Sequence, residues 1–301
     1  RPHPEAIKRF LEDTARVGQN TLQHVLLLGT ATVDSNDMMG IGDEDYVPTF
    51  YYRTNLNGYE APSDATFVSG LPNVTLGRLA VRSPSEAGAV IEKLISWYAG
   101  EAPLIGVSAY VADRESAGER SFFADMQAQI LASGEFASQA VPLRLDTVAS
   151  PTQTLEARLD MGVDFLNYHG HAYVSGWSSP EVANLAFAGR LSNEHLFFVM
   201  SFACFDGMFS GPWDESLAWE YVANPAGGAF GALAGSSLAA PEYVELFAAM
   251  VTDALASGSE TVGEAVAVAR RQLSMNLSKG AEDTLFTYNL LSDPAAPNPW
   301  R

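Results

Sequence analysis

The side chains best suited to covalent chemistry follow two β-rich runs of the sequence. The only cysteine, Cys204, comes two residues after the run 196–202, and His169 and His171 follow the run 163–168. A thiolate attacks a carbonyl carbon most readily when an imidazole lies near enough to exchange protons with it. Backbone N–H groups at the tight turns after strands can hold the resulting oxyanion. This arrangement indicates nucleophilic catalysis by Cys204.

The elements that must position these residues alternate along the chain. Strand-like runs recur between amphipathic segments, which predicts an α/β fold with a mostly parallel sheet. Ligands bind beyond the carboxyl ends of such strands, so Cys204, the two histidines and the pair Ser236-Ser237 are expected at one edge. The predicted strands are 24–29 (buried on both faces), 71–81, 104–111, 142–145, 163–168, 196–202 and 228–234. The predicted helices are 4–17, 83–98, 121–131, 150–161, 214–222, 241–255 and 261–277, and 30–65 is expected to form long loops.

Composition restricts the classes of protein that this chain can be. Of its 301 residues, 47% are hydrophobic and 18% charged, so it can bury an ordinary core. A net charge of −19 argues against a nucleic-acid binder and against docking on anionic membranes. There is no run of ~18 apolar residues, so no transmembrane helix is expected. A single cysteine cannot form an internal disulfide.

The segments around the histidines and the cysteine resemble the gingipain family of cysteine peptidases. Residues 167–171 read NYHGH, Trp177 follows, and residues 203–209 read ACFDGMF. Further segments are similar to family segments in the same order: LLLGTA at 26–31, VPT at 47–49, SD at 63–64, LGRLAVR at 76–82, ESLA at 215–218 and LLSDPA at 290–295. The resemblance covers about residues 4–296, nearly the whole chain.

The resemblance implies a caspase-like, mostly parallel sheet flanked by helices. A smaller N-terminal α/β subdomain is expected over residues 1–100 and the catalytic subdomain over 101–301. Cys204 matches the family nucleophile and His171 the catalytic histidine. We therefore expect a cysteine endopeptidase that acts on peptides or proteins through an acyl-enzyme, with His171 and the turn amides lowering the pKa of the Cys204 thiol.

The resemblance also implies supporting roles at the same site. Backbone N–H groups of Cys204 and Ala172 would hold the oxyanion, although the family usually has glycine where Ala172 stands. Gly170 and Trp177 are expected beside the substrate, and Ser236 and Ser237 would wall its pocket. A carboxylate that orients the histidine is expected just after the strand 104–111, where Asp113 is favoured over Glu115 and Glu119. The acidic residue of arginine-specific relatives aligns with Ser121, so arginine specificity is not implied.

Two other functions of the same fold stay open. The first is a sortase-like transpeptidase of a bacterial secretion system, in which an amine replaces water. The second is a catalytically dead binding module, favoured by Ala172 and by the missing specificity acid. A thiol-reactive peptide would distinguish a working nucleophile from an inert buried cysteine.

No cofactor is required by this chemistry, and no catalytic metal is expected. His169, His171, Cys204 and Asp206 could supply zinc ligands, but their spacing is not a recurring zinc pattern. The acidic loop is a candidate site for a structural Ca²⁺, since it holds Asp34, Asp37, Asp43, Glu44 and Asp45. The first four residues are not a signal peptide, while the family resemblance implies a bacterial protein that is secreted or held at the cell surface. The oligomeric state is left open.

Overall fold

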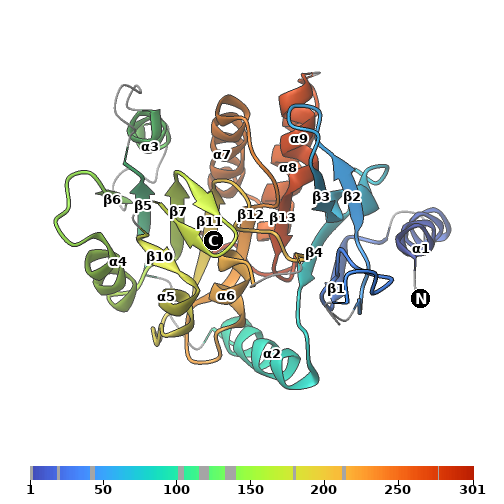
Figure 1. The fold of residues 1–301 in the computed structure, drawn as a ribbon, viewed down its shortest axis with the longest axis horizontal. Coiled ribbons are helices and arrows are strands. Elements are labelled where there is room, and N and C mark those ends of the chain that lie inside the picture. The colour runs from blue at the N-terminus through green and yellow to red at the C-terminus, as the bar shows by residue number, and fades with distance from the viewer. Residues whose placement is uncertain are drawn as a thin grey trace.

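The computed structural model gives the chain an α/β fold (Figure 1). It describes residues 3–18, 21–40, 45–100, 105–114, 122–132, 140–178, 181–211, 215–276 and 278–301. The helices are α1 (Pro4–Val17), the 3₁₀ helix η1 (Asp64–Val68), α2 (Pro84–Tyr98), α3 (Phe122–Ala132), α4 (Pro151–Asp160), α5 (Leu185–Gly189), α6 (Leu217–Ala223), α7 (Pro241–Ala256), α8 (Val262–Leu273) and α9 (Lys279–Thr287). The strands are β1 (His24–Leu28), β2 (Phe50–Arg53), β3 (Glu60–Ser63), β4 (Thr75–Leu79), β5 (Ser108–Ala112), β6 (Ala140–Arg144), β7 (Phe165–His169), β8 (Ala172–Tyr173), β9 (Gly176–Trp177), β10 (Ala183–Asn184), β11 (Phe197–Phe202), β12 (Ala229–Gly235) and β13 (Tyr288–Leu291).

A six-stranded sheet forms the centre of the molecule, in the order β13-β12-β11-β7-β5-β6. Every neighbouring pair is parallel except β12 with β13. The strands β7 and β11 are buried along their whole length, as expected for a sheet that helices cover on both faces. The predicted mostly parallel sheet is therefore confirmed.

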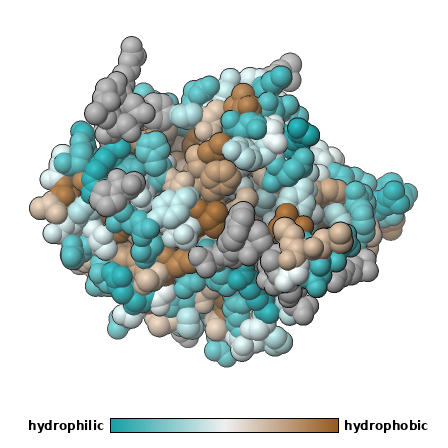
Figure 2. Space-filling model, viewed as in Figure 1, coloured by the Kyte–Doolittle hydropathy of each residue, from teal (hydrophilic) through white to brown (hydrophobic). Residues whose placement is uncertain are grey.

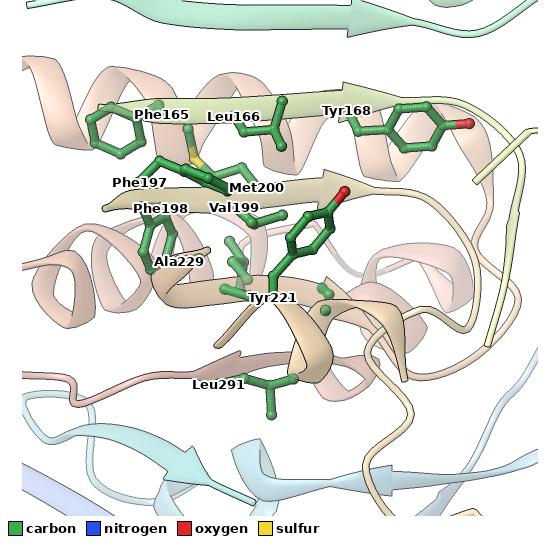
Figure 3. Packing of buried hydrophobic residues seen from close by; sticks show 14 of the residues in the cluster. Phe165, Leu166, Tyr168, Phe197, Phe198, Val199, Met200, Tyr221, Ala229 and Leu291 are labelled. Carbon is green, nitrogen blue, oxygen red and sulfur yellow. The ribbon is translucent and has the colours of Figure 1, made fainter. Parts of the chain in front are cut away.

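Helices cover both faces of this sheet. Figure 1 shows α3 and α7 above the sheet and α2, α5 and α6 below it. On the lower side, Tyr221 of α6 lies beside Val199 of β11 (Figure 3). The aromatic rings of Trp97 on α2 and Phe230 on β12 stack with their centroids 4.1 Å apart. Packing of this kind holds the helices against the lower face of the sheet.

The N-terminal part has its own small core, in which Leu11, Leu27 and Phe67 are buried together. Helix α2 packs instead with the large core, as do Leu79 and Val81. The boundary near residue 100 stays a prediction, and the packing groups residues 79–97 with the large sheet.

A buried ion pair joins the N-terminal part to the segment that follows Cys204. The Arg78 guanidinium donates to both carboxylate oxygens of Asp64, at 2.6 and 2.8 Å, and both side chains are almost fully buried. Its central carbon lies 4.7 Å from the ring centroid of Phe209. Bidentate geometry suits a planar guanidinium, so this pair orders the two segments that meet there.

Some predicted elements are wrong. The segment 30–65 contains the hairpin β2–β3 as well as loops, because Tyr51 and Tyr52 pair with Pro62 and Ala61. The strand β1 is not buried on both faces, since the side chains of Leu26 and Leu28 are 41% and 45% exposed. It belongs to a two-stranded sheet with β4, separate from the central one.

The end of the chain also differs from the prediction. Two helices were expected to close it, but α9 and the antiparallel strand β13 follow them. Helix α2 is capped by Ser83, whose side chain accepts a hydrogen bond from the Glu86 N–H. No helix in the described ranges is long and apolar enough to span a membrane.

Candidate active site

The cysteine and the histidine occupy matching positions beyond two adjacent strands. Strands β7 and β11 are parallel, and their last paired residues are His169 and Phe202. His171 lies two residues beyond the first and Cys204 two residues beyond the second. The sheet therefore delivers both side chains to the same edge, as the sequence predicts.

Hydrogen bonds fix the backbone of His171 on both sides. Its N–H donates to Asp113 Oδ2 at 3.1 Å. Its carbonyl oxygen accepts from the Tyr168 hydroxyl at 2.7 Å and from the Ser178 N–H at 2.8 Å. The imidazole is exposed, and the Phe123 ring meets it edge-on, with centroids 5.1 Å apart. The loop thus holds the histidine while its ring faces solvent.

Asp113 lies one residue beyond β5, the strand next to β7. Its carboxylate accepts from the N–H groups of His171 and Arg114 and from the Ser178 hydroxyl. The side chain is 4% exposed. Asp113 therefore supports the histidine through the loop backbone. The alternatives Glu115 and Glu119 lie outside the described residues, as does Ser121.

A tight turn carries the thiol of Cys204. The next residue, Phe205, has φ of +62°, a left-handed conformation that costs an L-residue about 1–2 kcal/mol. Two bonds to the end of β12 hold it: the Phe205 N–H donates to the Ser237 carbonyl, and the Gly207 N–H donates to the Gly235 carbonyl. A Cβ at position 207 would collide with the backbone of Ala234, so only glycine fits. Strain held in place by surrounding bonds is a common property of functional turns.

Burial raises the pKa of the Cys204 thiol above its ordinary value, and the nearby charge of Asp206 raises it further. A hydrogen bond with the Ala239 backbone opposes this shift but does not reverse it. The expectation that the pKa is lowered is therefore wrong, because the side chain is half-buried and the charge of Asp206 acts in the same direction as burial. With its pKa raised, the thiol is expected to carry its proton near neutral pH.

Comparison with protein-family models gives one match over nearly the whole chain. The model of peptidase family C25 matches residues 1–298. The chain belongs to this family, the gingipain family. No curated protein matches the sequence significantly.

Solved structures of C25 peptidases share the fold. In the complex of the RgpB pro- and mature domains from Porphyromonas gingivalis, 17% of residues are identical, with a TM-score of 0.74 over 98% of this chain and 70% of that one. The Arg-specific cysteine proteinase gingipain R is also 17% identical, with a TM-score of 0.75 over 98% of this chain and 68% of that one. A structure described as a protease is 13% identical, with a TM-score of 0.76 and coverage of 98% and 68%. Likeness at this level of identity shows the caspase-like fold.

Three residues expected beside the substrate have buried roles in this C25 fold. Trp177 is fully buried and stacks on Tyr168, with ring centroids 4.2 Å apart. Ser236 is fully buried and donates to backbone oxygens of the N-terminal part and of α9. Gly170 is buried where a Cβ would collide with Asp113 and Tyr168. Their expected contact with the substrate stays a prediction, and in this structure none of the three offers exposed surface.

Of the two other predicted residues, Ala172 lies closer to the surface and Ser237 lies behind the turn that carries Cys204. Ala172 is half-buried and begins β8, directly after His171. Ser237 is almost fully buried, and its carbonyl oxygen holds the Phe205 N–H. Ser237 thus supports the turn from behind, whereas a role for the Ala172 N–H as an oxyanion donor stays a prediction.

Sequence reasoning gave Ser178 and Phe123 no role at this site and considered Asp206 only as a zinc ligand. Ser178 has φ of +66° and bonds Asp113, and Asp206 is a fully buried carboxyl group two residues after Cys204. A carboxyl group so close to the nucleophile was the available signal for Asp206. No signal in the sequence indicates that Asp113 and Ser178 bond to each other, because only the fold brings these distant residues together.

No group of side chains in the described ranges is arranged to bind a metal ion. No three His, Cys, Asp or Glu residues there are placed to hold an ion. His169 is fully buried, which lowers its pKa to about 3, and its Nδ1 lies 2.6 Å from Met126 Sδ. Asp34 accepts from the N–H groups of Met38 and Met39, whereas Asp43 and Glu44 lie outside the described residues. The calcium prediction therefore stays open.

Proposed function

We propose that the protein is a cysteine endopeptidase with Cys204 as nucleophile and His171 as acid and base. The observation that carries the proposal is the matched placement of the two residues, each two positions beyond the paired ends of adjacent strands. Membership of peptidase family C25 supports the same reaction class.

The neutral thiol decides how the reaction begins. Because burial raises the pKa of Cys204, the thiol keeps its proton until the substrate binds. We infer that the His171 imidazole takes this proton as the sulfur attacks the peptide carbonyl. The negative oxygen that forms would be held by the backbone N–H groups of Cys204 and Ala172.

The same proton completes the first half of the cycle. His171 transfers it to the departing amine as the C–N bond breaks, which leaves an acyl group on sulfur. His171 then removes a proton from water, the hydroxide attacks the thioester, and the thiol recovers its proton. Asp113 keeps the histidine loop in place throughout, through its bond to the His171 N–H.

We propose peptides and proteins as substrates, without a preference for arginine. The absence of an acidic residue at Ser121 supports the second part of this statement. We also propose, from family membership, that the protein acts outside the bacterial cell or on its surface.

The test is cleavage of a mixed peptide library near neutral pH with reductant, read by mass spectrometry. Cys204→Ala and His171→Ala are each expected to abolish cleavage or lower kcat about 100-fold to 10,000-fold. His24→Ala is the matched control, since His24 lies on β1 in the separate two-stranded sheet. Cleavage that survives Cys204→Ala would overturn the proposal.

Two added conditions separate the other functions. Joining of peptides only after a primary amine is added would indicate a transpeptidase, because the acyl-enzyme then reacts with the amine. Failure of both cleavage and labelling by a thiol-reactive peptide would indicate a binding module.

A further inference from the structure

A buried carboxyl group lies between the nucleophile and the histidine loop. Asp206 is fully buried, two residues after Cys204. None of its hydrogen-bond partners in the described ranges is a cation, and its Oδ1 has no hydrogen-bond partner there. A buried charge without a counterion costs several kcal/mol, so such a residue calls for a reason.

The other carboxyl oxygen of Asp206 joins two different elements. Oδ2 accepts from Trp177 Nε1 at 2.7 Å and from the Ser201 hydroxyl. Ser201 belongs to β11, the strand that leads into the Cys204 turn, whereas Trp177 belongs to β9. The backbone of Asp206 is tied to the turn, because its N–H donates to the Cys204 carbonyl at 2.8 Å.

Trp177 in turn supports the histidine loop at two points. It pairs with Ala172, the residue after His171, in the β8–β9 ladder. Its indole stacks on Tyr168, whose hydroxyl donates to the His171 carbonyl at 2.7 Å. A continuous chain of contacts therefore runs from the Cys204 turn through Asp206 and Trp177 to His171.

We propose that Asp206 is a positioning residue that fixes the Cys204 turn relative to the His171 loop through the Trp177 indole. This inference rests on the proposed function, in which those two side chains exchange a proton. Misplacement of reacting groups by as little as about 1 Å can lower a rate about 100-fold.

The contacts of Asp206 need an acceptor but do not need a negative charge. The titratable groups that face it are Cys204, Tyr168 of β7, Tyr221 of α6 and Tyr288 of β13, and its charge helps raise the pKa of each. An amide oxygen at the same place would accept from Trp177 and Ser201 equally well. Asparagine should therefore preserve the positioning, and alanine should remove it.

The experiment compares two variants that each remove one donor to the same oxygen. Trp177→Phe removes the bond to the histidine loop, and Ser201→Ala removes the bond to the nucleophile's own strand. Asp206→Ala and Asp206→Asn complete the set. Circular dichroism and a thermal melt on each full-length variant check the fold, and if Asp206→Ala does not fold, the pair at 177 and 201 still decides the question.

The first readout does not depend on peptidase activity. Cys204 is the only cysteine, so the mass gained with iodoacetamide reports its reactivity alone. We expect the pH profile of alkylation in the wild type to contain a step due to His171, which His171→Ala removes. Trp177→Phe and Asp206→Ala should lose this step, whereas Ser201→Ala and Asp206→Asn should keep it.

The second readout is peptide cleavage. Trp177→Phe and Asp206→Ala should lower kcat about 10-fold to 100-fold with KM within about threefold. Ser201→Ala and Asp206→Asn should stay within about threefold of wild type in kcat. The double variant Trp177→Phe/Asp206→Ala should be no slower than the slower of its two single variants, because both changes interrupt the same chain of contacts.

The outcomes separate the two proposals. A histidine step that Trp177→Phe retains, or that is absent from the wild type, overturns the positioning role whether or not peptides are cut. Equal losses in Ser201→Ala and Trp177→Phe also overturn it, since they indicate a packing effect alone. A wild type with the histidine step but without cleavage contradicts only the peptidase.

Discussion

The two ends of the central sheet differ in how several of their buried polar groups are bonded. At the amino ends of the strands, Asp164 accepts from the N–H groups of residues 105, 106 and 107 and contacts His195 Nε2 at 2.9 Å. Nearby, Lys93 donates to three backbone carbonyls, and the Asn193 and Asn224 side chains both donate and accept. These groups are satisfied by their neighbours, as in a region that stabilises the fold.

At the carboxyl ends of the strands, several buried polar atoms of the described residues lack a hydrogen-bond partner. Asp206 Oδ1, His169 Nε2 and the Ser237 hydroxyl are buried there without a partner in the described ranges. Two of the non-glycine residues with positive φ, Ser178 and Phe205, belong to the same end. The difference indicates that stability is concentrated at one end of the sheet and that strain is accepted at the end where catalysis is proposed.

The largest effect on stability is expected at the amino ends of the central strands. Asp164→Ala should lower the free energy of unfolding by about 3–5 kcal/mol, because it leaves three backbone donors and His195 without their acceptor. Urea denaturation measures this loss. The exposed Asp160→Ala is the matched control, and kcat of the folded fraction should not change in either variant. A loss of kcat in folded Asp164→Ala would break the comparison.

The next effect is a pH dependence at the carboxyl end. Burial raises the pKa of Asp206 to about 7, against about 4 in an unfolded chain. The folded state therefore binds this proton more tightly, and the associated stability is complete below pH 4 and lost as the pH rises through 7. Relative to Asp206→Asn, the wild type should lose up to about 4 kcal/mol of unfolding free energy between pH 4 and 8. Parallel stability curves for the two proteins would contradict this prediction.

The smallest effect concerns the turn that carries the thiol. Phe205→Gly should be more stable than Phe205→Ala by about 1 kcal/mol, because φ of +62° strains alanine but not glycine. Comparing these two variants cancels the lost contact with Tyr59, whose ring centroid lies 6.1 Å from that of Phe205. Ala87→Gly in α2 is the control and should destabilise by a similar amount. Thermal melts measure both differences, and a less stable glycine at 205 would remove the argument for strain.

Much of the architecture follows from local patterns in the sequence. Helix-period and strand-like runs in alternation predict a parallel sheet, and that sheet fixes which residues share its carboxyl edge. Counting from strand ends places Cys204 and the two histidines there, whereas the choice of His171 and of Asp113 comes from the family resemblance. The hairpin β2–β3 escapes this reasoning because Pro62 lies within it and because β2 ends at Arg53, seven positions before its partner strand begins at Glu60.

The electrostatics of the site depend on packing that a linear pattern does not contain. A thiol beside a histidine suggests a lowered pKa, yet burial and Asp206 raise it. Trp177 and Asp206 are 29 residues apart, and neither residue type indicates that they form a hydrogen bond. The order of the motifs therefore predicts the location of the site better than it predicts the pKa values and hydrogen bonds of the groups there.

The segment after Cys204 is fastened to the beginning of the chain. Thr30 Oγ1 donates to the Phe209 carbonyl, and the Tyr51 hydroxyl donates to Ser210 Oγ, across separations of 179 and 159 residues. Ser236 at the neighbouring strand end is held by the Thr287 carbonyl. During synthesis, Thr30 and Tyr51 are made long before their partners Phe209 and Ser210. The turn that carries Cys204 therefore cannot be complete until the later residues have been made. We expect this turn to be incomplete in a growing chain that has not yet reached Thr287.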